Sequence, residues 1–118
     1  MNKILIVDDA LFMRKVIRRN LEEHTDVQIM EACDGDEAVR LYAQWKPDLV
    51  LMDITMPNKT GIEALEEIRE SDPNARIIMC SAVGQEPMIT KALNLGALDF
   101  IVKPFKADEF RKVLDYYL

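Results

Sequence analysis

Short apolar runs alternate with longer amphipathic segments along the whole chain, and this alternation limits the possible folds more than any other feature. Several of the runs are apolar on nearly every residue, which is typical of strands buried on both faces of a parallel sheet. They predict strands at Lys3–Val7, Val27–Glu31, Asp48–Asp53, Arg76–Ser81 and Leu98–Val102. Between them, apolar residues recur at helical spacing, as at Ala38, Leu41, Tyr42 and Trp45.

The pattern gives five strand–helix units with no internal linker and no repeat. Right-handed crossovers then require helices on both faces of the sheet. We therefore expect one doubly wound (βα)5 domain of the α/β class, spanning residues 1–118. Gly96 suits the left-handed cap that ends the fourth helix. An open sheet of this kind binds ligands at the carboxyl ends of its strands, where the strand order reverses.

Composition excludes several classes of function. The net charge of −6 and the pI of about 4.8 disfavour binding to nucleic acid or to an anionic membrane. No apolar stretch approaches the ~20 residues of a membrane span. A strand that begins at Lys3 leaves no room for a signal peptide. We expect a cytoplasmic protein in which Cys33 and Cys80 are reduced thiols.

Ionic residues follow three of the predicted strands. Asp8 and Asp9 end the first strand, Asp53 ends the third, and Lys103 follows the fifth. Two carboxylates ~4 Å apart repel by about 4 kcal/mol at an effective dielectric near 20, so such a cluster would recruit a cation or take up protons. Magnesium suits the site because it binds one or two protein carboxylates and keeps water and phosphate oxygens as its other ligands. The spacing predicts a magnesium site at Asp8, Asp9 and Asp53, in which Asp9 binds the ion directly and Asp8 binds it directly or through water.

A carboxylate beside magnesium can attack phosphorus and become an aspartyl phosphate. We assign Asp53 as the nucleophile and Lys103 as the cationic partner of the phosphoryl group. Ser81, which ends the fourth strand, could hydrogen-bond a phosphoryl oxygen. Taken alone, Lys103 could equally be a solvated lysine, and Ser81 could simply satisfy the local backbone. His24 is the sole histidine, so the phosphoryl group is expected to come from outside the chain.

These residues resemble the response-regulator receiver domain. Three characteristic segments occur in the family's order: Ile4-Leu5-Ile6-Val7-Asp8-Asp9, Met52-Asp53-Ile54-Thr55-Met56-Pro57 with Gly61, and Lys103-Pro104-Phe105. The likeness covers the whole chain, and within the family it is greatest to the stand-alone CheY-type chemotaxis regulators. The receiver fold is itself a standard example of ligand binding at the carboxyl edge of the sheet. The resemblance implies a flavodoxin-like sheet of strand order 2-1-3-4-5.

The resemblance also implies roles for single residues. Asp53 matches the phosphoacceptor, and Asp8, Asp9 and the backbone carbonyl of Thr55 match the Mg2+ ligands. Lys103 matches the family's lysine, and Ser81 matches the switch hydroxyl. Phe100 falls at the switch aromatic, where many chemotaxis regulators carry tyrosine, so it can move but cannot hydrogen-bond through a hydroxyl.

The partners implied are a histidine kinase as phosphodonor, the flagellar motor switch protein as output target and a phosphatase. We expect a monomer that catalyses its own phosphorylation and dephosphorylation and is not otherwise an enzyme.

Other functions are compatible with parts of the sequence. The chain could be a stand-alone phosphorelay receiver or the isolated receiver domain of a larger regulator. It could also be a phosphatase or phosphotransferase with an aspartyl intermediate, although no second aspartate closely follows Asp53 as an acid–base group. A nucleotide-binding domain is disfavoured because no glycine-rich phosphate loop follows the first strand.

Overall fold

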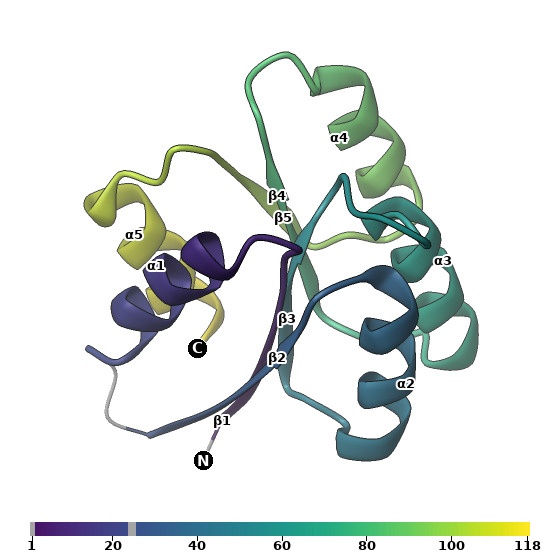
Figure 1. Ribbon diagram of the computed structural model, residues 1–118, viewed down its shortest axis with the longest axis horizontal. Coiled ribbons are helices and arrows are strands. Elements are labelled where there is room, and N and C mark those ends of the chain that lie inside the picture. Colours follow the sequence, from purple (N-terminus) through teal and green to yellow (C-terminus); the bar gives the residue numbers. More distant parts are fainter. Residues whose placement is uncertain (1, 24–25) are drawn as a thin grey trace.

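A computed structural model describes residues 2–23 and 26–118, so the sole histidine, His24, lies outside the described residues. Within them the chain forms a five-stranded parallel sheet of order β2-β1-β3-β4-β5 with helices on both faces (Figure 1). The strands are β1 (Asn2–Val7), β2 (Val27–Ala32), β3 (Leu49–Asp53), β4 (Ile77–Ser81) and β5 (Asp99–Val102). The helices are α1 (Leu11–Leu21), α2 (Gly35–Trp45), α3 (Gly61–Ser71), α4 (Glu86–Asn94) and α5 (Ala107–Tyr117). The predicted fold class and strand order are confirmed.

The two faces of the sheet carry separate cores, because successive side chains of a strand point to opposite faces. Leu5 and Met52 pack with α2, α3 and α4 on one face. Ile4 and Leu51 pack with α1 and α5 on the other face, where Phe110 is among the largest buried side chains. Figure 1 shows the two helical layers on either side of the strands. Burial on both faces explains why the central strands β3 and β4 are almost continuously apolar, whereas the edge strands β2 and β5 are partly exposed.

Local signals set the helix boundaries. The Asp34 carboxylate accepts a hydrogen bond from the Glu37 N–H and caps the start of α2. Thr60 and Glu63 form a reciprocal capping box at the start of α3. Gly96 has φ +102° just beyond α4, as its left-handed cap requires. The caps of α2 and α3 fix where the loops after β2 and β3 end at the carboxyl edge of the sheet, and Gly96 ends α4 at the opposite edge.

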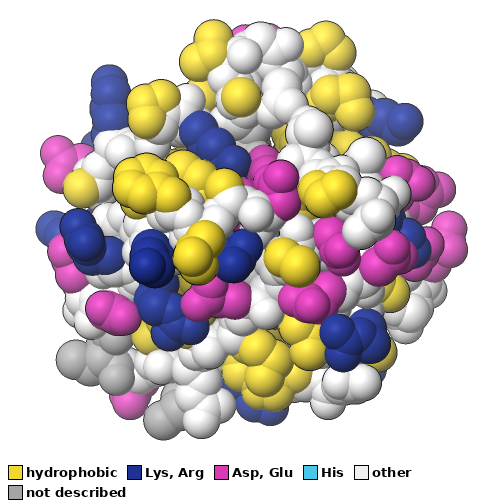
Figure 2. Space-filling view, in the orientation of Figure 1, with side chains coloured by type: hydrophobic (Ala, Val, Ile, Leu, Met, Phe, Trp, Pro, Cys, Tyr) yellow, Lys and Arg dark blue, Asp and Glu magenta, His cyan; other side chains and the backbone are white. Residues whose placement is uncertain are grey.

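The surface is acidic along α3, where Glu63, Glu66, Glu67 and Glu70 are exposed. Figure 2 shows acidic side chains gathered over this helix. None of the helices in residues 2–23 and 26–118 is long and apolar enough to cross a membrane. Cys33 is an exposed free thiol and Cys80 a buried one, and burial raises the pKa of the Cys80 thiol to about 12.

Candidate functional site

Parallel strand pairing brings the predicted ionic residues to one edge of the sheet. Val7 pairs with Met52, so Asp8 leaves β1 beside Asp53 at the end of β3. Asp53 in turn pairs with Cys80, and Ser81 pairs with Val102. Lys103 follows β5, and its N–H donates a hydrogen bond to the Ser81 carbonyl at 2.7 Å. Its peptide bond to Pro104 is cis.

The Lys103 ammonium joins two of the aspartates directly. Its Nζ lies 2.8 Å from Asp8 Oδ2 and 3.0 Å from Asp53 Oδ1. Asp8 is 1% exposed and Asp53 is 8% exposed, whereas Asp9 is exposed at the rim. The structure therefore brings the buried Asp8 and Asp53 and the half-buried Lys103 into one ionic cluster with Asp9 at its edge.

Burial and like charge act against ionisation of Asp53. Its burial raises the pKa of the carboxyl, and the neighbouring Asp8 carboxylate raises it further. The hydrogen bond and charge of Lys103 lower the same pKa, but the net direction is upward from the ordinary value of 3.8. For Lys103, burial lowers the pKa, and the hydrogen bonds to Asp8 and Asp53 outweigh this and raise it. The lysine is held as a cation between two carboxylates.

The acidic residues fit a hard divalent cation. Asp8, Asp9 and Asp53 each offer a carboxylate oxygen, and these oxygens all lie within 4.8 Å of one another. Magnesium prefers oxygen ligands and uses few protein carboxylates, so this donor set suits it. Thr55, whose carbonyl is the other predicted ligand, lies exposed in the loop that follows β3.

Ser81 ends β4, next to Cys80, which pairs with Asp53, and Phe100 lies on the neighbouring strand β5. Ser81 is fully buried, and among the described residues its Oγ has no hydrogen-bond partner. Phe100 is 38% exposed and lines a groove of about 420 Å3 between α4 and β5, together with Val83 and Leu93. A buried hydroxyl without a partner is unfavourable, so Ser81 would gain from a new acceptor near Asp53.

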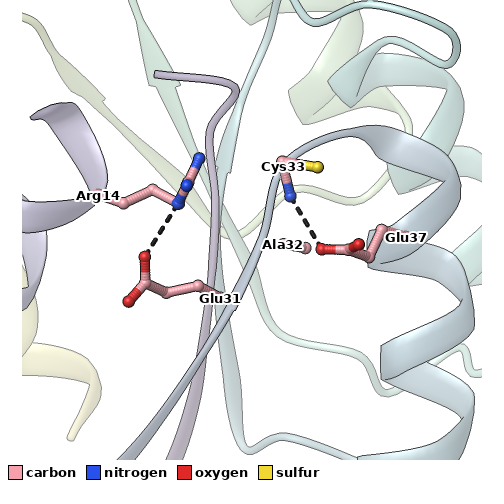
Figure 3. A pocket seen from close by; sticks show the side chains of 5 residues that line it. All are labelled: Arg14, Glu31, Ala32, Cys33 and Glu37. Atoms are coloured by element: carbon pink, nitrogen blue, oxygen red, sulfur yellow. Dashed lines mark hydrogen bonds and ion pairs between the residues drawn. The ribbon is translucent and has the colours of Figure 1, made fainter. Parts of the chain in front are cut away.

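Arg14 on α1 supports the site, although the sequence indicated no role for it. Its Nη1 donates a hydrogen bond to the Asp8 carbonyl at 2.7 Å, and its Nε lies 2.9 Å from Glu31 Oε1. Arg14 and Glu31 line a hollow of about 200 Å3 together with Cys33 and Glu37 (Figure 3). Burial raises the pKa of Glu31, but Arg18 and Arg14 outweigh this and lower it. The ion pair anchors the backbone of Asp8 to α1 and to the end of β2.

Gly61 permits a close approach of α3 to the site. Its N–H donates a hydrogen bond to the Ile54 carbonyl at 2.8 Å. A Cβ at this position would lie 1.9 Å from the Asp53 carbonyl oxygen, which no side chain can do. The glycine of the sequence motif is therefore required by contact with the backbone of Asp53.

Comparison with known proteins identifies a family. Residues 4–115 match the family described as the response regulator receiver domain. The chain is 51% identical to the chemotaxis protein CheY of Listeria monocytogenes over 116 residues, covering 98% of this chain and 97% of that protein. It is 53% identical to Protein CcdB of Bacillus subtilis over 115 residues, covering 98% of this chain and 93% of the relative.

A solved structure agrees with these relatives. The CheY of the CheX-CheY-BeF3-Mg2+ complex from Borrelia burgdorferi superimposes with a TM-score of 0.88 at 38% identity. The superposition covers 99% of this chain and 90% of that one.

Proposed function

The chain belongs to the response regulator receiver domain family, and from this we propose that it is a single-domain response regulator, residues 1–118, phosphorylated on Asp53. One observation carries the proposal: the ammonium of a half-buried lysine, Lys103, lies 3.0 Å from Asp53 and 2.8 Å from Asp8 at the carboxyl edge of the sheet. This arrangement holds a cation where the charge of a transferring phosphoryl group would develop.

Asp53 supplies the nucleophile. Lys103 binds Oδ1, and we assign the second carboxylate oxygen as the one that attacks phosphorus. With a phosphohistidine donor, an O–P bond forms on Asp53 as the N–P bond breaks, and the electron pair of that bond returns to the imidazole. Lys103 then neutralises a phosphoryl oxygen. In this proposal the domain catalyses its own phosphorylation and dephosphorylation and is not otherwise an enzyme.

Magnesium would be held by Asp8, Asp9, Asp53 and the Thr55 carbonyl, and when bound it supplies positive charge to the phosphoryl oxygens. Asp8 is already fixed by its hydrogen bonds with Lys103 and, through its carbonyl, with Arg14. The site is thus arranged before the donor arrives, which lowers the reorganisation needed during transfer.

The phosphoryl signal would reach the surface through Ser81 and Phe100. The Ser81 hydroxyl gains an acceptor when a phosphoryl oxygen forms near Asp53, which favours its inward movement. Phe100 can then rotate from the groove into the space that is vacated. The apolar groove between α4 and β5 changes shape and becomes the output face.

The partners belong to the same proposal. The similarity to CheY supports a histidine kinase as phosphodonor and the flagellar motor switch protein as output target. A phosphatase is a further partner in this proposal, and the Borrelia burgdorferi complex shows that a CheY can bind a second protein, there CheX. We propose that the domain acts as a monomer in the cytoplasm.

Mass spectrometry after incubation with acetyl phosphate and magnesium tests the proposal. The protein is expected to gain the mass of one phosphoryl group, and Asp53→Asn is expected to gain none. Asp26→Asn is the matched control, because Asp26 is exposed at the opposite edge of the sheet, where β2 begins. An equal mass gain in Asp53→Asn would refute Asp53 as the acceptor.

A phosphorelay receiver is the second candidate, because Protein CcdB, a relative of similar identity, is not named as a chemotaxis protein. The two functions differ in what phosphorylation controls. If binding of a flagellar switch peptide increases on phosphorylation, the chemotaxis role is supported. If the peptide does not bind and the phosphoryl group passes to a histidine phosphotransferase, the relay role is supported.

A further inference from the structure

The side chain of Gln85 bridges the loop after β3 and the loop after β4. Its Oε1 accepts a hydrogen bond from the Ala82 N–H at 2.6 Å, and its Nε2 donates one to Thr55 Oγ1 at 2.9 Å. The Gln85 carbonyl accepts hydrogen bonds from the N–H groups of Met88 and Ile89, which anchors the residue to the start of α4. A carboxamide suits this bridge because it carries both an acceptor and donors.

The two bridged residues adjoin the groups that would react and move. Thr55 lies two residues after Asp53, and Ala82 directly follows Ser81. The Ser81 hydroxyl is fully buried and has no partner among the described residues, which is unfavourable and would favour its movement towards an acceptor. Because Ala82 is covalently joined to Ser81, the hydrogen bond from Ala82 to Gln85 resists movement of Ser81.

We propose that Gln85 is a positioning residue, a latch that ties the two loops together and holds Ser81 in its withdrawn position. The proposal rests on the phosphorylation of Asp53 proposed above. In this proposal, inward movement of Ser81 breaks or rearranges the hydrogen bond from the Ala82 N–H to the Gln85 side chain. Since Gln85 precedes the first turn of α4 and Ala82 lines the groove beside that helix, release of the latch also alters the groove.

The first test measures the rate of phosphorylation by acetyl phosphate with magnesium. Gln85→Met keeps the length of the side chain but cannot bridge, and we expect phosphorylation roughly fivefold faster, which corresponds to the loss of about one net hydrogen bond. Gln85→Ala is expected to behave in the same way. Gln44→Met is the matched control and should keep the wild-type rate, because Gln44 is exposed on α2.

The second test separates positioning from a general structural role. Thr55→Val removes the acceptor of the hydrogen bond from the Gln85 amide. Its effect on the phosphorylation rate should therefore be largely absent in a protein that already carries Gln85→Met. The Ala82 amide proton should also exchange with solvent faster in Gln85→Met than in the wild type, while exchange from the β3 amides stays unchanged. Unchanged β3 exchange shows that the variant is folded.

The outcomes separate this inference from the proposed function. The latch is overturned if the wild-type and Gln85→Met proteins are phosphorylated at the same rate. It is also overturned if the fold-changes in rate caused by Thr55→Val and by Gln85→Met simply multiply in the double variant. If the wild-type protein gains no phosphoryl group, the proposed function fails. The rate of hydrogen exchange at the Ala82 amide then remains as the test of whether Gln85 restrains the loop. Faster exchange in Gln85→Met then supports a latch on the loop, and unchanged exchange overturns it.

Discussion

At the scale of a single residue, Asp53 must be ionised to act as a nucleophile, although it is buried next to another carboxylate. A nucleophilic carboxylate must be ionised, yet burial and the charge of Asp8 both favour the protonated form. Lys103 offsets part of this penalty through its hydrogen bond to Asp53. The folded protein therefore bears a cost at neutral pH for keeping the acceptor charged.

Asp53→Asn is expected to raise the free energy of unfolding at about pH 7 by on the order of 1 kcal/mol, because it removes one of two adjacent buried carboxylates. The raised pKa of Asp53 means that the wild-type protein recovers this stability as the pH falls through that pKa towards the ordinary value of 3.8. The difference between variant and wild type should shrink with acidification. Urea unfolding without magnesium, from about pH 7 to about pH 4, measures it.

Asp26→Asn serves as the control for a surface carboxylate at the other edge of the sheet and should change stability little at either pH. If Asp53→Asn is less stable than the wild type at neutral pH, the ion pair with Lys103 outweighs burial and repulsion. That outcome would contradict the direction of the pKa shift argued for Asp53.

At the scale of elements, the apolar runs located the strands well. Each of the predicted strands agrees with the structure to within one residue at either end, as Asp48–Asp53 does with β3 (Leu49–Asp53). A central strand buried on both faces is almost wholly apolar, so the charged residue that follows the apolar run marks its end, as Asp8 does after β1 and Asp53 does in β3. Since ligands bind at those ends, the positions of Asp8, Asp53 and Lys103 along the sheet edge followed from the same pattern.

The side-chain contacts between elements could not be predicted in this way. The bridge from Gln85 to Thr55 joins residues 30 positions apart, and the anchor from Arg14 to Glu31 joins residues 17 apart. Neither contact leaves a trace in hydropathy or spacing, because each depends on the rotamer of one long polar side chain. That the buried Ser81 hydroxyl has no partner within residues 2–23 and 26–118 likewise becomes known only when its neighbours are placed.

The junction of β3 and α3 gives a prediction at this scale. Gly61→Ala places a methyl group against the carbonyl oxygen of Asp53. Neither the methyl carbon nor the carbonyl oxygen can move away by a side-chain rotation, so β3 and α3 must separate. We expect a loss of at least about 2 kcal/mol in the free energy of unfolding. Slower phosphorylation of Asp53 should accompany it. Urea unfolding and the acetyl phosphate assay measure the two effects.

Gly84→Ala is the comparison, because a Cβ there meets nothing within 4 Å and only the backbone at φ +93° is strained. Its expected cost is about 1 kcal/mol. If Gly61→Ala proves no more destabilising than Gly84→Ala, the close packing of α3 against Asp53 does not constrain the site.

At the scale of the whole molecule, the acidic cluster exists only when the central strands have paired. Asp8 and Asp53 come from β1 and β3, which pair directly, and Lys103 follows β5 at the far edge. The hydrogen bonds from Lys103 span 95 residues to Asp8 and 50 residues to Asp53. An unfolded chain cannot present these groups together, so a cation that needs them binds the folded state alone and stabilises it.

Millimolar magnesium is accordingly expected to stabilise the protein by about 1–3 kcal/mol, as mass action predicts when the cation is well above its dissociation constant. Removal of magnesium with EDTA should reverse the gain. The stabilisation should be largely lost in Asp9→Asn, which removes an exposed ligand without disturbing the buried ion pair, and should persist in Asp26→Asn. Thermal unfolding of the three proteins with and without magnesium measures this. If magnesium raises the unfolding temperature of Asp9→Asn as much as that of the wild type, the cation binds elsewhere on the acidic surface. A cation held at the carboxyl edge would bind more weakly once a carboxylate there is removed.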